Sequence, residues 1–334
     1  MERALATIDV ITDLKPIEKA DFLELATVRG WMCVVKKDDF KVGDTCVYFE
    51  IDSLLPTEPQ FQFLEKGSGL KICNIDGSER KGYRLKTIKL RGQISQGLAM
   101  PTNLFPELAD YVVGDDVTAK LGVYKYEGAI GRIPPAFAKG PFPGFIPKTD
   151  EERVQNMLPK LQQHNGVQCQ ITEKLDGMSA TFYRHNGEFG VCSRNLDLKD
   201  GDNVFWNIAR ENNLESLPDG FAIQGEIIGP SIQGNPLMRS KPELYVFSIY
   251  DIKASNYLAL DRLKLLVNDA VKTVPVITED VIHTDIAKWI ALAEGTSKLS
   301  SANREGIVIR SYGTREDMVS FKVISNSYLL KHDS

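Results

Sequence analysis

The stretch that most constrains the fold is a turn that begins with a lysine, Lys174-Leu175-Asp176-Gly177, between two segments in which apolar and polar residues alternate. The alternation covers residues 167–172 and 180–184, and a period of two residues predicts β-strands. Lys174 therefore lies at a strand end, with Glu173 before it and an acid and a glycine after it. An ordinary surface hairpin fits the same residues, because Lys, Asp and Gly are common in turns.

Length and composition are those of an ordinary soluble globular protein. The 334 residues suit two domains, and 43% of them are hydrophobic and 25% charged. The net charge of −5 excludes a protein that holds nucleic acid by bulk positive charge, so a polyanion must meet a local basic patch. The apolar runs are too short to span a membrane and the N-terminus shows no secretory signal, so we expect no membrane attachment.

The metal-binding residue types are dispersed. The five cysteines are widely spaced without a Cys-x-x-Cys pair, and the four histidines are scattered. We therefore expect reduced thiols, no structural zinc and an intracellular, reducing compartment, cytoplasmic or nuclear.

Residues 1–120 have the pattern of a small all-β module. Short apolar runs recur between turn signals such as Val42-Gly43-Asp44, which favours a barrel or a sandwich. The predicted strands are 4–11, 23–28, 32–35, 45–49, 83–88 and 97–100.

A local basic patch lies within this module. Residues 80–91 contain six cations and no acid. Over residues 84–88 bases alternate with apolar residues, so one face of a strand would be basic and the other buried. The pattern fits a nucleic-acid surface made by Arg84, Lys86, Lys89 and Arg91, and it fits equally a solvated edge strand protected by lysines.

The remainder of the chain changes character twice. Residues 121–148 are rich in Gly and Pro and predict a linker between domains. Thr149-Asp150-Glu151-Glu152-Arg153 then predicts a capped helix start. Residues 149–334 predict an α+β domain, with strands at 167–172, 180–184, 188–193, 222–228, 244–252, 306–311 and 318–323 and helices at 203–212, 259–270 and 284–294.

Further polar and aromatic residues lie in or beside these predicted strands. Ser193-Arg194-Asn195 follows one strand, and Glu226 lies in another. Phe247 lies in a strand with aromatic residues on both faces, Glu305 directly precedes a strand, and Lys322 lies in the last one. Phe247 is also consistent with plain core packing, and Arg194 with a surface ion pair. Glu305 is harder to place in a core, because a carboxylate entering a buried strand needs a partner.

Together these segments resemble the covalent nucleotidyltransferase superfamily, which includes polynucleotide ligases and capping guanylyltransferases. The matching segments are 174–177, 193–195, 225–227, 246–251, 305–309 and 320–322. More narrowly, residues 84–98 and 149–156 resemble the Deinococcus-type RNA ligases, which place an OB module before the catalytic domain. The resemblance covers nearly the whole chain and implies an OB-like β-barrel module followed by an adenylation domain, ATP-grasp-like, built from antiparallel sheets and helices.

The resemblance implies a role for each site residue. Lys174 would form a lysyl-AMP with ATP, Glu305 and Glu226 would serve Mg²⁺ or Mn²⁺, and Lys322 would contact the α-phosphate. Glu226 would also hold the ribose, Phe247 would stack on adenine and Glu173 would read its amino group.

Three further residues have less defined roles. Arg194 and Asn195 would lie near the ribose or phosphate, and Asp176 would support the loop or the waters of the metal. One departure stands out: the fifth motif often has two lysines one residue apart, whereas Ser320 or Ile324 occupies the second position here. Lys322 would act alone, or with a cation such as Arg310 or Lys331.

The expected reaction is sealing of RNA 3′-hydroxyl and 5′-phosphate ends, in nick or RNA repair, by a monomer with no obligate protein partner. A lysine nucleophile must be neutral when it attacks, and neighbouring carboxylates raise a lysine pKa. Glu173 and Asp176 therefore cannot activate Lys174, and a metal cation must reverse the local sign. A DNA ligase, a capping enzyme and a nucleic-acid-binding adaptor with an inactive transferase domain are the alternatives. The substrate, whether a nicked duplex, a tRNA or an RNA–DNA hybrid, stays open.

Overall fold

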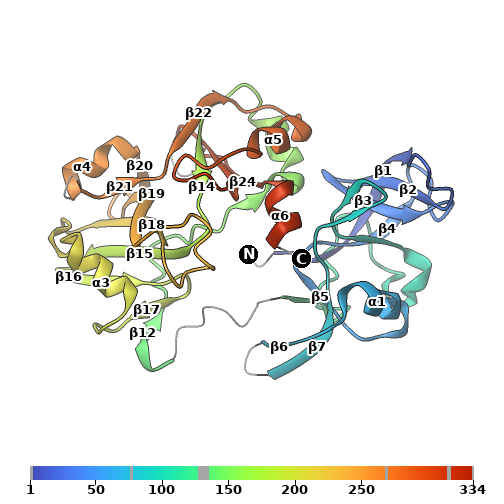
Figure 1. The fold of residues 1–334 in the computed structure, drawn as a ribbon, viewed down its shortest axis with the longest axis horizontal. Coiled ribbons are helices and arrows are strands. Elements are labelled where there is room, and N and C mark those ends of the chain that lie inside the picture. Colours follow the sequence, from blue (N-terminus) through green and yellow to red (C-terminus); the bar gives the residue numbers. More distant parts are fainter. Residues whose placement is uncertain (1–2, 76–77, 127–134, 268–269, 314–316, 333–334) are drawn as a thin grey trace. The chain divides into compact units, whose positions relative to one another are not determined.

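The computed structural model describes residues 3–75, 78–126, 135–267, 270–313 and 317–332. By its contacts the chain forms two compact units, Met1–Ala129 with Leu329–Ser334, and Ile130–Tyr328 (Figure 1). The segment predicted as a linker contains strand β11 (Tyr124–Lys125) in the first unit and β12 (Ala138–Pro141) in the second, and residues 127–134 lie outside the described part. None of the described helices is long and apolar enough to cross a membrane.

The first unit is the predicted all-β module. A five-stranded sheet has the order β10-β4-β1-β2-β3 and a four-stranded sheet the order β11-β5-β7-β6. Its core contains Phe49, Phe61 and Phe105, and the rings of Phe49 and Phe61 meet edge to face with centroids 5.4 Å apart. The elements are β1 (Ala6–Pro16), β2 (Leu23–Val28), β3 (Trp31–Lys36), β4 (Thr45–Phe49), β5 (Ser53–Leu55), α1 (Glu65–Ser68), β6 (Leu70–Ile75), β7 (Ser78–Arg84), β8 (Ile88–Leu90), β9 (Gln93–Ser95) and β10 (Leu98–Pro101).

The strand predicted over residues 83–88 is wrong in its second half. Strand β7 ends at Arg84, and the chain then turns into a separate hairpin of β8 and β9. The partner strand β5 begins only at Ser53, because Asp52 adopts a left-handed φ of 69°. Residues 85–87 therefore lie between the two ladders, although Leu85 and Thr87 remain buried.

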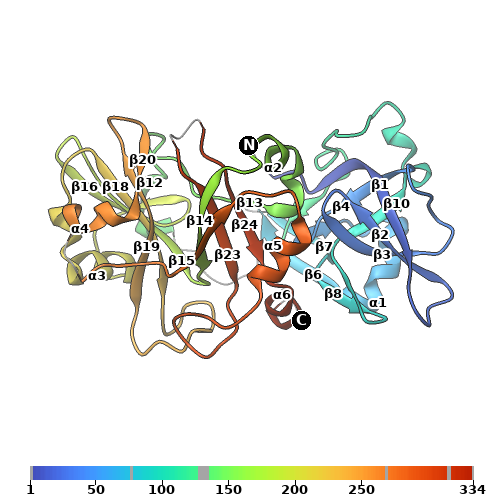
Figure 2. The same cartoon turned by 90° about the horizontal axis from the view of Figure 1, so that it is seen from above.

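The second unit is built on two sheets. An eight-stranded sheet has the order β12-β17-β16-β15-β18-β19-β20, with β21 paired to β19, and a five-stranded sheet has the order β13-β24-β23-β14-β22 (Figures 1 and 2). The strands are β13 (Glu152–Arg153), β14 (Gln168–Lys174), β15 (Met178–His185), β16 (Glu188–Cys192), β17 (Leu196–Leu198), β18 (Phe221–Ile228), β19 (Glu243–Asp251), β20 (Asn256–Leu258), β21 (Lys272–Thr273), β22 (Val276–Val281), β23 (Gly306–Ser311) and β24 (Ser320–Ile324). The helices are α2 (Leu158–Gln163), α3 (Val204–Glu211), α4 (Leu263–Leu266), α5 (Ile286–Ala293) and α6 (Asn326–His332).

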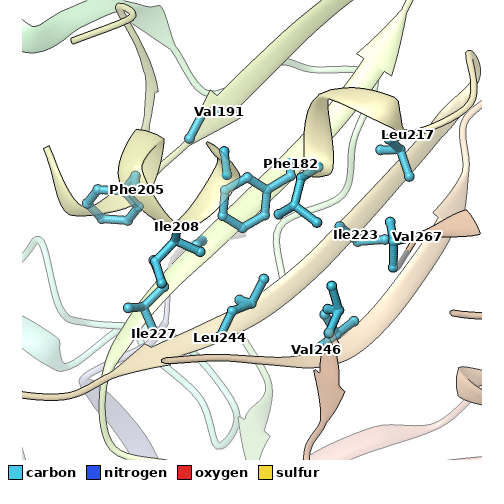
Figure 3. Close-up of a cluster of buried hydrophobic side chains, with 14 of the residues drawn as sticks. Phe182, Val191, Phe205, Ile208, Leu217, Ile223, Ile227, Leu244, Val246 and Val267 are labelled. Carbon is cyan, nitrogen blue, oxygen red and sulfur yellow. The ribbon is translucent and has the colours of Figure 1, made fainter. Parts of the chain in front are cut away.

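Helix α3 fixes the eight-stranded sheet from one side. Asn203 caps it, because its side-chain oxygen accepts from the amides of Phe205 and Trp206 at 3.1 Å each. Phe205 and Ile208 then pack against the strands in a continuous apolar cluster that includes Phe182 (Figure 3). Each such side chain contributes about 1.5–3 kcal/mol on full burial, so the sheet is a firm platform for the residues on its other face.

Helix α5 covers one face of the five-stranded sheet. Trp289 of this helix meets Phe321 of β24 edge to face, with ring centroids 5.6 Å apart. Cys169 and Ile171 of β14 belong to the same buried cluster. Because side chains alternate along a strand, Lys174 at the end of β14 faces the opposite way. All five cysteines are buried.

The helix predicted to start at residues 149–153 is wrong. Residues Glu152–Arg153 form β13 instead, parallel to β24, and α2 begins only at Leu158. The acids that suggested a helix start make other contacts: Glu152 accepts from Asn156 Nδ2 at 3.0 Å, and Asp150 pairs with Arg194 at 2.5 Å. In the described part of the helix predicted at 259–270, the structure has only a 3₁₀ turn and the short α4, and residues 268–269 lie outside the described ranges.

Candidate active site

The central contact joins Lys174 to Glu305. Lys174 is the last residue of β14 and stands opposite Gly306, the first residue of β23. This register brings Glu305 beside the lysine, whose Nζ donates to both carboxylate oxygens, at 2.7 and 2.8 Å. The side chains are 28% and 13% exposed, so the pair is largely shielded from solvent.

The charges around Lys174 favour its protonated form. Burial lowers the pKa of the amine, but Glu305, Glu226 and Asp176 outweigh this and raise it above the ordinary value. The free protein therefore holds Lys174 as a cation, which cannot act as a nucleophile.

Glu226 faces Lys174 from the eight-stranded sheet. It lies in β18 opposite Ser179 of β15, just after the nucleophile turn. Burial raises the pKa of its carboxyl to about 8, Lys174 opposes the rise, and Glu305 and Asp176 add to it. Three acids and one lysine thus share a small, poorly solvated space that favours an additional cation.

Asp176 and Glu173, which flank the lysine in the sequence, are each held by a different partner. Asp176 accepts a hydrogen bond from the hydroxyl of Tyr328 in α6. Glu173 is 2% exposed, and its Oε2 accepts from the amide of Lys298 at 2.7 Å. Within the described residues its Oε1 has no hydrogen-bond partner, although it is buried.

Phe247 and Lys322 lie in strands of the two sheets that carry the site. Phe247 in β19 of the eight-stranded sheet is partly buried and packs near Leu175 and Tyr245. Lys322 in β24 stands opposite Val308 of β23, and β23 separates β24 from β14 in the five-stranded sheet. Its charge reaches Glu305, because it lowers the pKa of that carboxyl against the larger effect of burial.

Arg194 and Asn195 lie further out. Arg194 pairs with Asp150, and both side chains are more than half exposed. Asn195 accepts from the Lys148 amine at 3.0 Å. Arg194 still lowers the pKa of Glu226 electrostatically, so it lies within range of the charge cluster.

The basic residues of the first unit divide into two kinds. Arg84 is engaged within the unit, 3.6 Å from Asp52 and with its guanidinium 4.7 Å from the centre of the Tyr126 ring. Lys89 and Arg91 are exposed on the β8–β9 hairpin, and Lys86 is partly exposed just before it.

Two residues with contacts at the site were not predicted for the roles they take. Tyr328 holds Asp176, and Arg310 contacts Phe247. A contact between residues 152 positions apart leaves no local pattern, so Tyr328 carried no signal. Arg310 was named only as a substitute cation for the fifth motif.

A nucleophile-like lysine at a strand end, acids on two facing sheets and a preceding β-module define a covalent nucleotidyltransferase of the ligase type. Family models agree: an OB-fold domain matches residues 5–102 and an RNA ligase domain matches residues 167–324. The chain belongs to the RNA ligase family.

Solved structures of Naegleria gruberi RNA ligase match nearly the whole chain. The structure with PPi is 40% identical, covers 99% of each chain and has a TM-score of 0.89. A lysine-to-alanine mutant with ATP and Mn is 39% identical over 98% of this chain and 99% of that chain, with a TM-score of 0.89. A glutamate-to-alanine mutant with AMP and Mn is 39% identical over 99% of each chain, with the same TM-score of 0.89. The search of curated proteins found no match.

Proposed function

We propose that this chain is an ATP-dependent RNA ligase that joins 3′-hydroxyl and 5′-phosphate ends through an AMP carried on Lys174. The observation that carries the proposal is the Lys174–Glu305 pair of the five-stranded sheet, together with Glu226 and Phe247 of the eight-stranded sheet. The family and the related structures with ATP, AMP and Mn support it.

The reaction has three nucleotidyl transfers. The neutral amine of Lys174 attacks the α-phosphorus of ATP, a nitrogen–phosphorus bond forms, and pyrophosphate leaves with the electron pair of the broken bond. An oxygen of the 5′-phosphate end then displaces the lysine and takes AMP. Finally the 3′-hydroxyl attacks the 5′-phosphorus, and AMP leaves as the phosphodiester forms.

The residues fit a divalent cation. No group of three or more His, Cys, Asp or Glu side chains in the described ranges forms a ready-made metal cage. Mg²⁺ is commonly bound by one or two carboxylates together with substrate phosphates. Glu305 and Glu226 would supply the two carboxylates, and ATP would supply the phosphates. When bound, Mg²⁺ or Mn²⁺ would supply positive charge beside the amine and the α-phosphate. Burial raises the pKa of the Glu226 carboxyl to about 8, and Lys174 only partly offsets this, so an added cation would favour the ionised carboxylate.

The remaining residues would orient the nucleotide. Phe247 offers a partly buried ring for adenine, and the unpartnered Oε1 of Glu173 fits an acceptor for an amino group. Lys322 would oppose the charge of the α-phosphate. Arg194 and Asn195 lie at the rim, where the ribose or a nucleic-acid end would pass, and Asp176 would hold the nucleophile turn.

We further propose a nicked RNA-containing duplex as the substrate, a monomer as the working form and a reducing compartment, with which the buried cysteines are consistent. Lys86, Lys89 and Arg91 would contact the phosphate backbone. Arg84 would contribute less, because Asp52 and Tyr126 already engage it.

Sealing of a labelled nick tests the function. Duplexes with RNA or DNA on each side of the nick are incubated with ATP, GTP or no nucleotide, and Mg²⁺ or Mn²⁺. We expect sealing with ATP of nicks that contain RNA, and no sealing by Lys174→Ala. Sealing of all-DNA nicks at an equal rate would indicate a DNA ligase. Covalent labelling of the protein by GTP would indicate a capping enzyme. Inactivity with every substrate would indicate a nucleic-acid-binding adaptor.

A further inference from the structure

Arg310 of β23 reaches across to the other sheet and contacts the aromatic ring proposed for adenine. Its guanidinium carbon lies 5.3 Å from the centre of the Phe247 ring, and its Nη1 donates to the carbonyl of Phe247. Because β23 and β19 belong to different sheets, this one side chain links the two sheets that carry the site.

Phe247 needs such a contact because it lies in a β-bulge. The pairing of β18 with β19 passes from Gln224–Ser248 directly to Gly225–Val246, so Phe247 has no opposite residue. A bulge redirects a side chain and leaves a residue out of the ladder. The hydrogen bond from Arg310 gives the carbonyl of this bulged residue a partner from the other sheet.

Arg310 is itself held in place. Its Nη2 donates to Glu151 at 2.8 Å, and its Nε lies 3.3 Å from both Glu151 and Ser320. Arg310 and Glu151 are 21% and 16% exposed. Such a planar, multiply bonded guanidinium has one orientation, which a lysine cannot reproduce.

These contacts argue against direct binding of phosphate. The sequence makes Arg310 a cation that could help Lys322, and the structure places it opposite Ser320, where the fifth motif often has a lysine. Its donors are directed instead to Glu151, Ser320 and Phe247. A phosphate would have to displace a carboxylate that already neutralises the charge.

We propose that Arg310 is a positioning residue for the base of ATP: it fixes the ring and backbone of Phe247 and does not contact the triphosphate. The inference rests on the proposed adenine-binding role of Phe247. The Arg310 contacts then contribute to the affinity for the base and leave the affinity for the phosphates unchanged.

The test separates base from phosphate binding by calorimetry, in a Lys174→Ala background that cannot react. The ligands are ATP and inorganic tripolyphosphate, each with Mg²⁺. We expect Arg310→Ala to weaken ATP binding about tenfold and tripolyphosphate binding less than about twofold. Arg310→Lys should weaken ATP binding to a similar extent, because it keeps the charge and loses the planar contacts.

A double-mutant cycle shows whether Arg310 acts through Phe247. We expect Phe247→Ala/Arg310→Ala to bind ATP no more weakly than Phe247→Ala alone. Arg210→Ala is the matched control, because Arg210 also pairs with an acid, Asp200, and lies 5.5 Å from an aromatic ring, that of Trp206, outside the site. It should leave both affinities unchanged.

Equal loss of both affinities, or independent effects in the double mutant, would overturn the positioning role. If the Lys174→Ala protein with Arg310 intact does not bind ATP, the proposed function is overturned together with this inference. This measurement is made first, so the two failures are distinguished before any Arg310 variant is compared. If Arg310→Ala does not fold, Glu151→Gln replaces it, because this change removes the charge that orients Arg310. The same selective loss of ATP affinity is then expected, and its absence contradicts the proposal.

Discussion

The hydroxyl of Tyr328 donates a hydrogen bond to the carboxylate of Asp176, two residues after the proposed nucleophile Lys174. Tyr328 lies in α6, whose first turn is fixed by Glu294: this carboxylate accepts from the amide of Asn326 at 2.7 Å and from the hydroxyl of Ser325 at 2.9 Å. The turn that carries the nucleophile is therefore held by a helix residue that lies 152 positions further along the chain.

Tyr328→Phe removes this hydrogen bond and keeps the ring. We expect a stability loss of about 1.5–3 kcal/mol, typical of a hydrogen bond to a charged group, and a roughly tenfold slower lysine adenylylation, because Asp176 is no longer oriented. Single-turnover labelling with ATP measures the rate. Tyr312→Phe is the control, since Tyr312 donates to Glu279 at 2.8 Å on an exposed surface. Equal rates in both variants would refute a role for Tyr328.

Gly177 permits the close approach of the nucleophile turn to β18. A Cβ at this position would collide with the backbone carbonyl of Ile227, which cannot move as a side chain can. We expect Gly177→Ala to lower stability by about 1–3 kcal/mol, as overpacking does, and to reduce adenylylation strongly. Gly201→Ala has open space around the added methyl group and should be neutral. Thermal unfolding and labelling measure both, and a fully active Gly177→Ala would contradict this view of the turn.

The turn illustrates what the sequence predicts about the site. Motif spacing placed Lys174, Glu305 and Lys322 at strand ends or within strands, and the register of β14, β23 and β24 brings them to adjacent strands. The contacts of Tyr328 and Arg310 depend on how distant segments pack, which periodicity does not encode. The roles assigned to the individual site residues stay predictions.

Two of the errors of the fold prediction, at residues 149–153 and 83–88, have the same origin. Residues 149–153 have the acids of a helix start, but a tertiary partner for Asp150 and the edge of β24 for Arg153 favour an extended chain. The alternation over 83–88 continues past Arg84, whereas the ladder ends with the left-handed Asp52. In both places a long-range contact outweighed the local preference.

Glu243 makes the stability of the fold depend on pH, and it is not one of the proposed active-site residues. Burial opposes ionisation, but hydrogen bonds from Arg239, Tyr245 and Lys272 lower the pKa of this carboxyl to about 2. A depressed folded-state pKa stabilises the protein above the ordinary value of 4.5, and this stabilisation is lost as the pH falls toward 2.

Glu243→Gln should therefore cost about 2 kcal/mol at neutral pH, because Arg239 loses its charged partner. Urea unfolding across the acid range measures the difference between the two proteins. We expect this difference to shrink as the pH falls below 4.5. A constant difference would mean that the carboxylate charge is irrelevant to stability.

The exposed cations before and within the β8–β9 hairpin should govern the salt dependence of nucleic-acid binding. Replacing Lys86, Lys89 and Arg91 by alanine should reduce the slope of log affinity against log salt by about 2–3, since each phosphate contact contributes roughly 0.7–0.9. Lys36, Lys37 and Lys41 are exposed cations of the same unit, and their triple alanine variant changes the net charge equally. Fluorescence anisotropy with a nicked duplex measures the slopes, and equal slopes for both triple variants would exclude a specific contact by the hairpin.

Location of the AMP adduct tests the central claim most directly. The protein is incubated with α-labelled ATP and Mg²⁺ or Mn²⁺, digested, and the labelled peptide is sequenced by mass spectrometry. We predict one AMP per chain on Lys174, released again by added pyrophosphate and absent from Lys174→Ala. Label on another residue, or label that persists in Lys174→Ala, would contradict the account.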